Sequence, residues 1–146
     1  MFKTMVVSLA VVFPLLAHAE SIEEKRERAD AEKWLESTAT SFNNACGAKI
    51  PTTGIIDWES WKTASDDKNH HAYTVCQGIV SGGQSTCSDK ISKDTVVKDI
   101  KRIVCKGDGT GDLKLELKDG TLIAHTHFLE DKPNSRTKTW LQKNLP

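Results

Sequence analysis

Two features that define large classes of proteins are missing from this sequence. No apolar run after residue 19 reaches the roughly 20 residues that a transmembrane helix needs. The chain also has no net charge, because its 20 lysine and arginine residues balance its 20 aspartate and glutamate residues. A neutral chain lacks the basic field that nucleic-acid binding requires. We therefore expect neither a nucleic-acid-binding protein nor a protein with a membrane span.

The motifs of common enzyme classes are missing as well. The sequence has no G-x-S-x-G nucleophile motif and no glycine-rich phosphate loop placed ahead of a helix. It also shows no internal repeat, linker or low-complexity segment. These absences favour a protein without catalysis of its own.

The first nineteen residues have the pattern of an export signal. Lys3 gives a weakly positive start, residues 5–16 form a short apolar run, and Ala17-His18-Ala19 supplies the small residues that a signal peptidase reads. We expect cleavage after Ala19, and a mature chain of residues 20–146 that forms one disulfide-bonded α+β domain. Such a protein would act in a periplasm or outside the cell.

The four cysteines agree with export. An even number in an exported protein indicates two disulfides, here formed by Cys46, Cys76, Cys87 and Cys105. Three pairings are possible. We favour Cys76 with Cys87 and Cys46 with Cys105, because Gly82-Gly83 offers a chain reversal between the first pair. The alternative is a zinc site of four thiolates, but the cysteines lack the paired spacing, C-x₂₋₄-C, that such sites use.

The clearest structural pattern is a β-hairpin around Asp119-Gly120. This dipeptide favours a two-residue turn, and alternating apolar residues flank it on both sides. The turn fixes the register, so that Leu117 faces Leu122 and Lys114 faces His125. One face of the hairpin should be buried and carries Leu113, Leu115, Leu117, Leu122, Ala124, Thr126 and Phe128. The other face should be solvent-exposed and carries Asp112, Lys114, Glu116, Lys118, Ile123, His125 and His127.

Helical patterns account for much of the rest. We predict a first helix over residues 21–45, with Ser21 as its N-cap, Glu24 in a capping box and a charged, solvated front part. Shorter helices are predicted after Asp57, over residues 70–80 and 92–98, and near the end of the chain with Ser135 as N-cap. Residues 49–56 are predicted to be extended or irregular, and residues 81–92 to form a loop. Residues 94–104 fit a helix or a strand, and we place a strand up to residue 106.

These elements add up to an α+β fold with two disulfides. A small antiparallel sheet, either a hairpin or a three-stranded meander over about residues 100–128, should pack against the N-terminal helix and the shorter helices. Trp58 and Trp61, one helical turn apart, are expected in the core.

Two histidines on the solvent-exposed face could bind a metal. His125 and His127 are two residues apart on a strand, so both rings face the same way. Neutral imidazoles suit zinc and copper, and Asp112, His70 or His71 could add a third ligand. Surface histidines without a metal are the simpler interpretation, so no cofactor is expected.

Two functional hypotheses follow, and the first is favoured. In the first, the protein is a small exported binding module without catalysis, which contacts a protein or envelope component through Lys114, Glu116, His125 and His127. In the second, it is a transition-metal-binding protein or a metal-dependent hydrolase that uses His125, His127 and Asp112.

Overall fold

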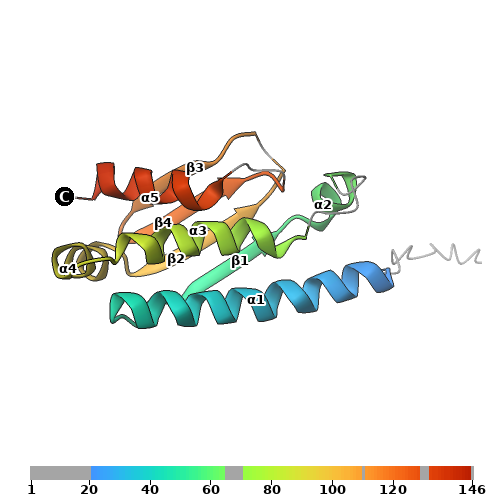
Figure 1. Cartoon of the computed structure of the whole chain (residues 1–146). Helices are drawn as coiled ribbons and strands as arrows, with labels where there is room; N and C mark the ends of the chain where they lie inside the picture. The colour runs from blue at the N-terminus through green and yellow to red at the C-terminus, as the bar shows by residue number, and fades with distance from the viewer. Residues whose placement is uncertain (1–20, 65–70, 110, 129–131, 146) are drawn as a thin grey trace, which may run out of the picture.

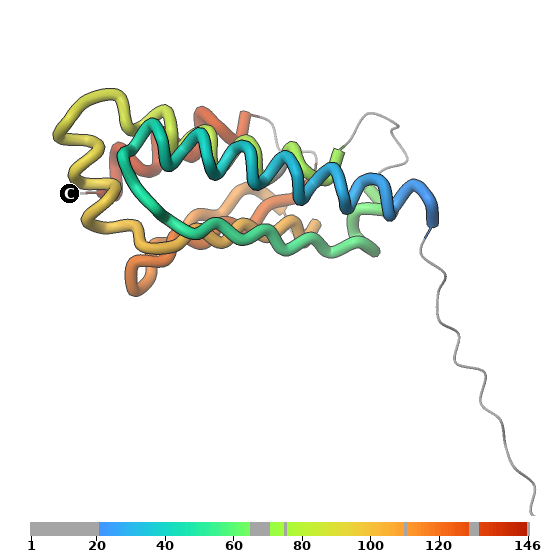
Figure 2. The backbone as a smooth tube through the Cα atoms, turned by 90° about the horizontal axis from the view of Figure 1, so that it is seen from below, coloured from blue at the N-terminus to red at the C-terminus, as the bar shows by residue number. Residues whose placement is uncertain are grey.

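The computed structural model describes residues 21–64, 71–109, 111–128 and 132–145. These residues form two layers, with helices on one face of a four-stranded sheet (Figures 1 and 2). The elements in chain order are α1 (Ile22–Cys46), β1 (Thr52–Ile56), α2 (Trp58–Ala64), α3 (Tyr73–Thr86), α4 (Lys90–Asp99), β2 (Arg102–Gly107), β3 (Lys114–Lys118), β4 (Thr121–Thr126) and α5 (Pro133–Asn144). The α+β class is confirmed. The export segment predicted for residues 1–19 lies outside the described residues.

The sheet is mixed, so the expected purely antiparallel sheet is wrong. Its strand order is β1-β2-β4-β3, with β1, β2 and β4 parallel and only β3 antiparallel to its neighbour. A meander would have placed β3 beside β2. Instead β4 lies next to β2, because its inward residues are all buried, whereas the more charged β3 takes an edge. Of the two alternatives left open for residues 49–56, the extended one holds for residues 52–56, which form a strand.

The predicted hairpin is confirmed in its turn and register. Lys118 pairs with Thr121, and Lys114 pairs with His125. Asp119 and Gly120 have φ angles of 49° and 74°, as a type I′ turn requires. Leu122, Ala124, Thr126 and Phe128 are buried on the expected face.

Helix α1 begins and ends as predicted. The Ser21 hydroxyl accepts a hydrogen bond from the Glu24 amide at 3.0 Å, and Gly47 closes the helix in the left-handed conformation. The front of the helix is less solvated than predicted, since Glu24 is only 4% exposed. Its carboxylate lies 2.8 Å from both Arg28 and Lys62, and these partners compensate the buried charge.

Helix α3 continues through the segment that was predicted to be a loop. It includes Gly82 and Gly83 and ends at Thr86. The glycines serve close packing rather than a turn. A Cβ atom on Gly78 would lie 2.3 Å from Pro133 Cγ, and one on Gly82 would lie 2.5 Å from the carbonyl oxygen of Asn134. Only glycine lets α5 approach α3 this closely.

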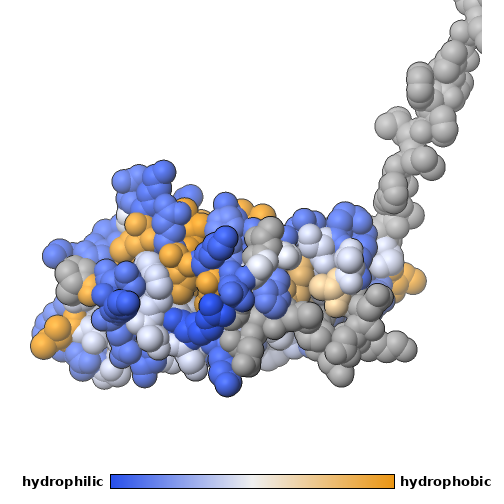
Figure 3. Space-filling view, turned by 90° about the horizontal axis from the view of Figure 1, so that it is seen from above, coloured by the Kyte–Doolittle hydropathy of each residue, from blue (hydrophilic) through white to orange (hydrophobic). Residues whose placement is uncertain are grey.

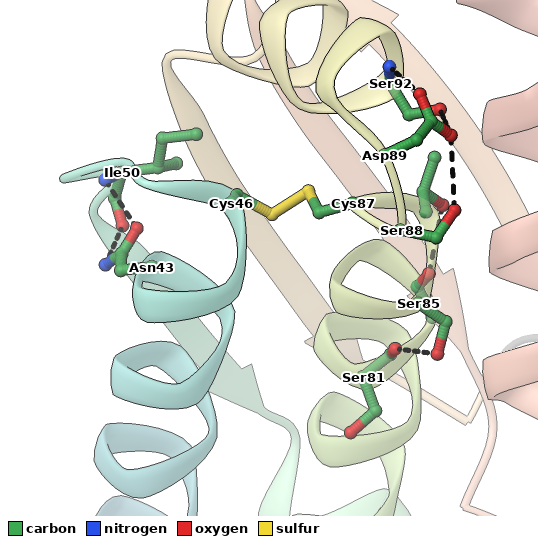
Figure 4. The surroundings of a disulfide bond; sticks show 11 residues. Asn43, Cys46, Ile50, Ser81, Ser85, Cys87, Ser88, Asp89 and Ser92 are labelled. Atoms are coloured by element: carbon green, nitrogen blue, oxygen red, sulfur yellow. Dashed lines mark hydrogen bonds between the residues drawn. A yellow bond between two sulfur atoms is a disulfide. The ribbon is translucent and has the colours of Figure 1, made fainter.

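The disulfides join Cys46 to Cys87 and Cys76 to Cys105, so the favoured pairing is wrong. Because α3 continues past Gly82, residues 76 and 87 are about 16 Å apart along a helix that rises about 1.5 Å per residue. A disulfide needs Cα atoms within about 7 Å. The observed bridges instead tie α3 to the end of α1 (Figure 4) and to β2, with Cα separations of 5.1 and 5.6 Å.

The remaining helices differ from prediction mainly at their first residues. Helix α4 starts earlier, with the Asp89 carboxylate accepting from the Ser92 amide at 2.9 Å. Helix α5 begins at Pro133, so Ser135 lies within its first turn and is not its N-cap. Proline is favoured there because the first helical amide needs no partner. Segment 94–104 is helix up to Asp99 and strand from Arg102.

The core lies between the two layers. One cluster gathers Phe42, Cys46, Ile50, Val80, Cys87, Val96, Ile100, Ile103, Leu122 and Leu141, and another gathers Trp61, Ala72, Cys76, Ile79, Cys105, Leu113, Ala124 and Phe128. Trp61 is buried as predicted, whereas Trp58 is half-buried with the Arg28 guanidinium 4.4 Å from its ring centre. Among the described helices we find no segment with the length and apolar character of a membrane span.

Candidate functional site

Three of the predicted site residues, Lys114, Glu116 and His125, lie on the face of the sheet that is turned away from the helices. Figure 2 shows the helices on one side of the sheet, and none of the described helices crosses the other side. Alternation along the strands sets which side chains this face carries. We define the open face as Thr53, Ile55, Arg102, Val104, Lys106, Lys114, Glu116, Lys118, Thr121, Ile123 and His125.

The open face has an apolar centre with charges around it. The strand registers place Thr53, Val104, Ile123 and Glu116 in one row, and Ile55, Lys106, His125 and Lys114 in the next. Arg102, Thr121 and Lys118 form a third row. Four basic side chains therefore share the face with one acidic side chain. Its local charge is positive, although the whole chain is neutral.

His125 is held by an aspartate that sequence reasoning did not single out. Its Nδ1 lies 2.7 Å from Oδ2 of Asp108, which directly follows β2. An ionised carboxylate only accepts hydrogen bonds, so the imidazole donates its Nδ1 proton. Both side chains are about one-third exposed. Asp108 thus fixes the ring of His125 at the edge of the open face.

A second aspartate follows β1 at the same end of the sheet. Asp57 accepts hydrogen bonds from the amides of Glu59 and Ser60 at 3.1 and 3.2 Å, and from the Ser60 hydroxyl at 2.8 Å. The Ser60 hydroxyl and amide hold the pKa of Asp57 below its usual range, while the charge of Asp108 opposes this shift. These hydrogen bonds make Asp57 the N-cap of α2, the helix that was predicted to follow it.

His127 lies at this end too, but in a different environment from His125. It lines a hollow of about 490 Å³ together with Glu59, Ser60, Thr63, Ala64, Gly109 and Phe128. The ends of β1, β2 and β4 are neighbours because these strands are parallel. In open sheets of parallel strands, ligands bind at this carboxyl end.

No recognisable catalytic arrangement is formed by the side chains at this end of the sheet, which are Asp57, Ser60, Asp108, His125 and His127. The Ser60 hydroxyl donates to Asp57, so its proton is not directed toward a histidine. Within the residues that the structure describes, no group of three or more histidine, cysteine, aspartate or glutamate side chains could hold a metal ion. Asp112 is exposed and precedes β3, and the paired register starts only at Lys114. His71 lies elsewhere, 3.0 Å from Glu27 on α1.

Sequence reasoning missed Asp57 and Asp108 as neighbours of the histidines. The available signal was that each follows an apolar strand directly. It could not be used, because residues 52–56 were not recognised as a strand and the parallel pairing was not foreseen.

Comparison of the chain with family models, with curated proteins and with solved structures found no match. The function is therefore argued from the geometry alone.

Proposed function

We propose that the protein is an exported, non-catalytic binding module that recognises an acidic surface of a protein partner through the open face. The observation that carries the proposal is the composition of this face. Arg102, Lys106, Lys114 and Lys118 surround apolar side chains on a sheet that no described helix covers on that side.

The physical properties of the open face suit such a role. The β-branched side chains of Val104 and Ile123 give an apolar centre, and the surrounding charges steer and orient an oppositely charged partner. The hydrogen bond between Asp108 and His125 keeps one contact residue in a fixed position. A rigid surface loses less conformational entropy when it binds.

Two disulfides support action outside the cytoplasm. They persist in oxidising compartments and are rare where thiols are kept reduced. Together with the predicted export signal, they favour a periplasmic or extracellular partner.

A charge-matched pair of variants tests the open face. One variant carries Lys106→Gln, Lys114→Gln and Lys118→Gln, and the control carries Lys49→Gln, Lys98→Gln and Lys143→Gln, which removes the same charge from other parts of the surface. Proteins from the extracytoplasmic fraction of the producing cells are captured on each, and a captured partner is purified and titrated by calorimetry.

The expected result is stoichiometric binding to the wild type and to the control. Binding to the open-face variant should weaken at least tenfold, and the wild-type affinity should fall as salt rises. Equal affinity of both variants for every purified partner would overturn the proposal.

A further inference from the structure

The strand β1 forms one edge of the sheet. Among the strands of the described residues, it pairs on one side only, with β2. The Pro51 carbonyl accepts from the Ile103 amide at 3.0 Å, and the Asp57 amide donates to the Gly107 carbonyl at 2.8 Å. Odd-numbered residues thus bond to β2. Since backbone groups of successive residues point to opposite edges, Thr52, Gly54 and Ile56 direct theirs outward.

A groove runs along this edge between β1 and α1. One hollow of about 290 Å³ has Arg28, Ala31, Glu32 and Leu35 on its helical side and Gly54, Ile55 and Ile56 on its strand side, with Trp58, Ala72, Tyr73 and Cys76 completing it. A second hollow of about 380 Å³ lies between Glu32–Asn43 side chains of α1 and Ile50, Pro51 and Thr52. Both hollows are lined by Glu32 and Leu35, so they are neighbours along α1. Figure 2 shows α1 and β1 running alongside each other in the two layers.

The groove contains a polar atom that lacks a partner. Oγ1 of Thr52 is buried and makes no hydrogen bond within the described residues. A buried hydroxyl without a hydrogen bond costs free energy. The Thr52 side chain is on the face of the sheet that packs against the helices, as is the buried Ile103 beside it, so replacing the hydroxyl leaves the outward backbone groups of β1 in place.

The two edges of the sheet differ in protection. Proteins commonly place lysines and other charges on edge strands to prevent further pairing. Strand β3, with the sequence KLELK, has such charges at alternate positions, and on the side of the molecule where β3 and α5 lie hydrophilic residues surround a hydrophobic patch (Figure 3). Strand β1, with the sequence TTGII, has none, and its central residues are exposed.

We infer that β1 accepts an extended segment of a partner polypeptide as a fifth strand. Side chains of that segment that point toward the helices would enter the hollow beside Leu35, Trp58 and Tyr73, which suits apolar residues. The exposed carboxylates of Glu32 and Glu36 on the α1 rim favour lysine or arginine next to them. The side chains of the segment that point toward the helices, at every second position, therefore include both apolar and basic residues. This site shares Ile55 with the open face but uses none of its basic side chains, so either proposal can fail without the other.

A pair of variants at one residue tests the inference. Thr52→Pro removes an outward-pointing amide at the first position of an edge strand, where proline is tolerated. Thr52→Val removes the hydroxyl but keeps that amide. A library of random nine-residue peptides is selected on the oxidised wild-type protein after depletion on the Thr52→Pro variant, and enriched peptides are synthesised for titration by NMR.

The expected peptides carry apolar and basic residues at every second position, which are the positions that point toward the helices. They should protect the amides of Thr52, Gly54 and Ile56 from exchange with solvent, while Thr53 and Ile55, already bonded to β2, keep their protection. Affinity should fall about three- to tenfold in Thr52→Pro, which is the worth of about one hydrogen bond, and should be nearly unchanged in Thr52→Val.

Three outcomes would overturn the inference. Selection could yield no peptide that prefers the wild type over Thr52→Pro, or peptides whose NMR shifts lie outside β1 and α1. Alternatively, sedimentation could show a wild-type dimer that Thr52→Pro dissociates, which would assign the edge to a second copy of the chain.

Discussion

Replacing Gly82 by alanine should destabilise the protein, although alanine is the better helix former. In an unhindered helix this change stabilises by about 1 kcal/mol. Gly82 lies within α3 where α5 packs against it, and an added Cβ would lie 2.5 Å from the Asn134 carbonyl oxygen and 2.7 Å from Thr137 Cβ. Neither distance is compatible with the present arrangement of the two helices.

The size of this loss of stability depends on which atoms the added Cβ would meet. The oxygen belongs to the backbone of α5, and Thr137 Cβ is attached directly to that backbone, so neither can rotate aside. Helix α5 would have to move away from α3. Overpacking costs about 1–3 kcal/mol, and we expect the upper end here. Subtracting the gain of about 1 kcal/mol in helix propensity leaves a net loss of about 2 kcal/mol.

Urea denaturation of the oxidised protein, followed by tryptophan fluorescence, measures this loss. Gly83→Ala is the matched comparison in the same helix, since its Cβ would lie 3.1 Å from Phe42 Cε2, a ring edge that can shift slightly. We expect a clearly smaller loss for that variant. A Gly82→Ala protein as stable as the wild type, or equal losses for both variants, would refute the close-packing argument.

Two further predictions concern the disulfides and the buried carboxylate of α1. Replacing Cys46 and Cys87 by alanine should cost about 4 kcal/mol, because that bridge closes a loop of 41 residues, and a loss below about 1 kcal/mol in urea denaturation would contradict it. Hydrogen bonds from Lys62 and, to a smaller extent, from Arg28 hold the pKa of Glu24 below its usual range despite burial. The ionised carboxylate therefore stabilises the fold, and this contribution is lost as the pH falls below about 4.3. Glu24→Gln should therefore flatten the loss of stability in acid, whereas Glu23→Gln, an exposed neighbour, should leave the acid profile as in the wild type.

Sequence reasoning succeeded where neighbours along the chain decide the structure. The hairpin is set by the turn chemistry of Asp119-Gly120 and by strict alternation on both sides, so its register could be written down residue by residue. The ends of α1 were equally local, because Ser21 and Gly47 act on amides and carbonyls within one turn.

It failed where the deciding contact is distant. Gly82 and Gly83 resemble a loop in the sequence, and only the presence of α5 turns them into a helical packing surface. That error led to the wrong disulfide pairing, since a helix separates two cysteines that a loop could have joined. The strand order depends in the same way on competition among strands that lie far apart in the chain.

The failure at β1 has a direct bearing on both proposals. Pro51 and Gly54 left residues 49–56 predicted as extended or irregular and not as a definite strand, because glycine and proline weaken a strand. In the structure the missing Cβ of Gly54 lets Leu35 of α1 come close, since an added Cβ would lie 3.0 Å from Leu35 Cδ2. Leu35 is also one of the two residues that both hollows of the groove share. Gly54, which made the strand hard to predict from the sequence, is therefore also the residue that lets α1 pack against the edge of β1. Once residues 52–56 are known to be a strand, Asp57, Asp108, His125 and His127 all lie at the same end of the sheet.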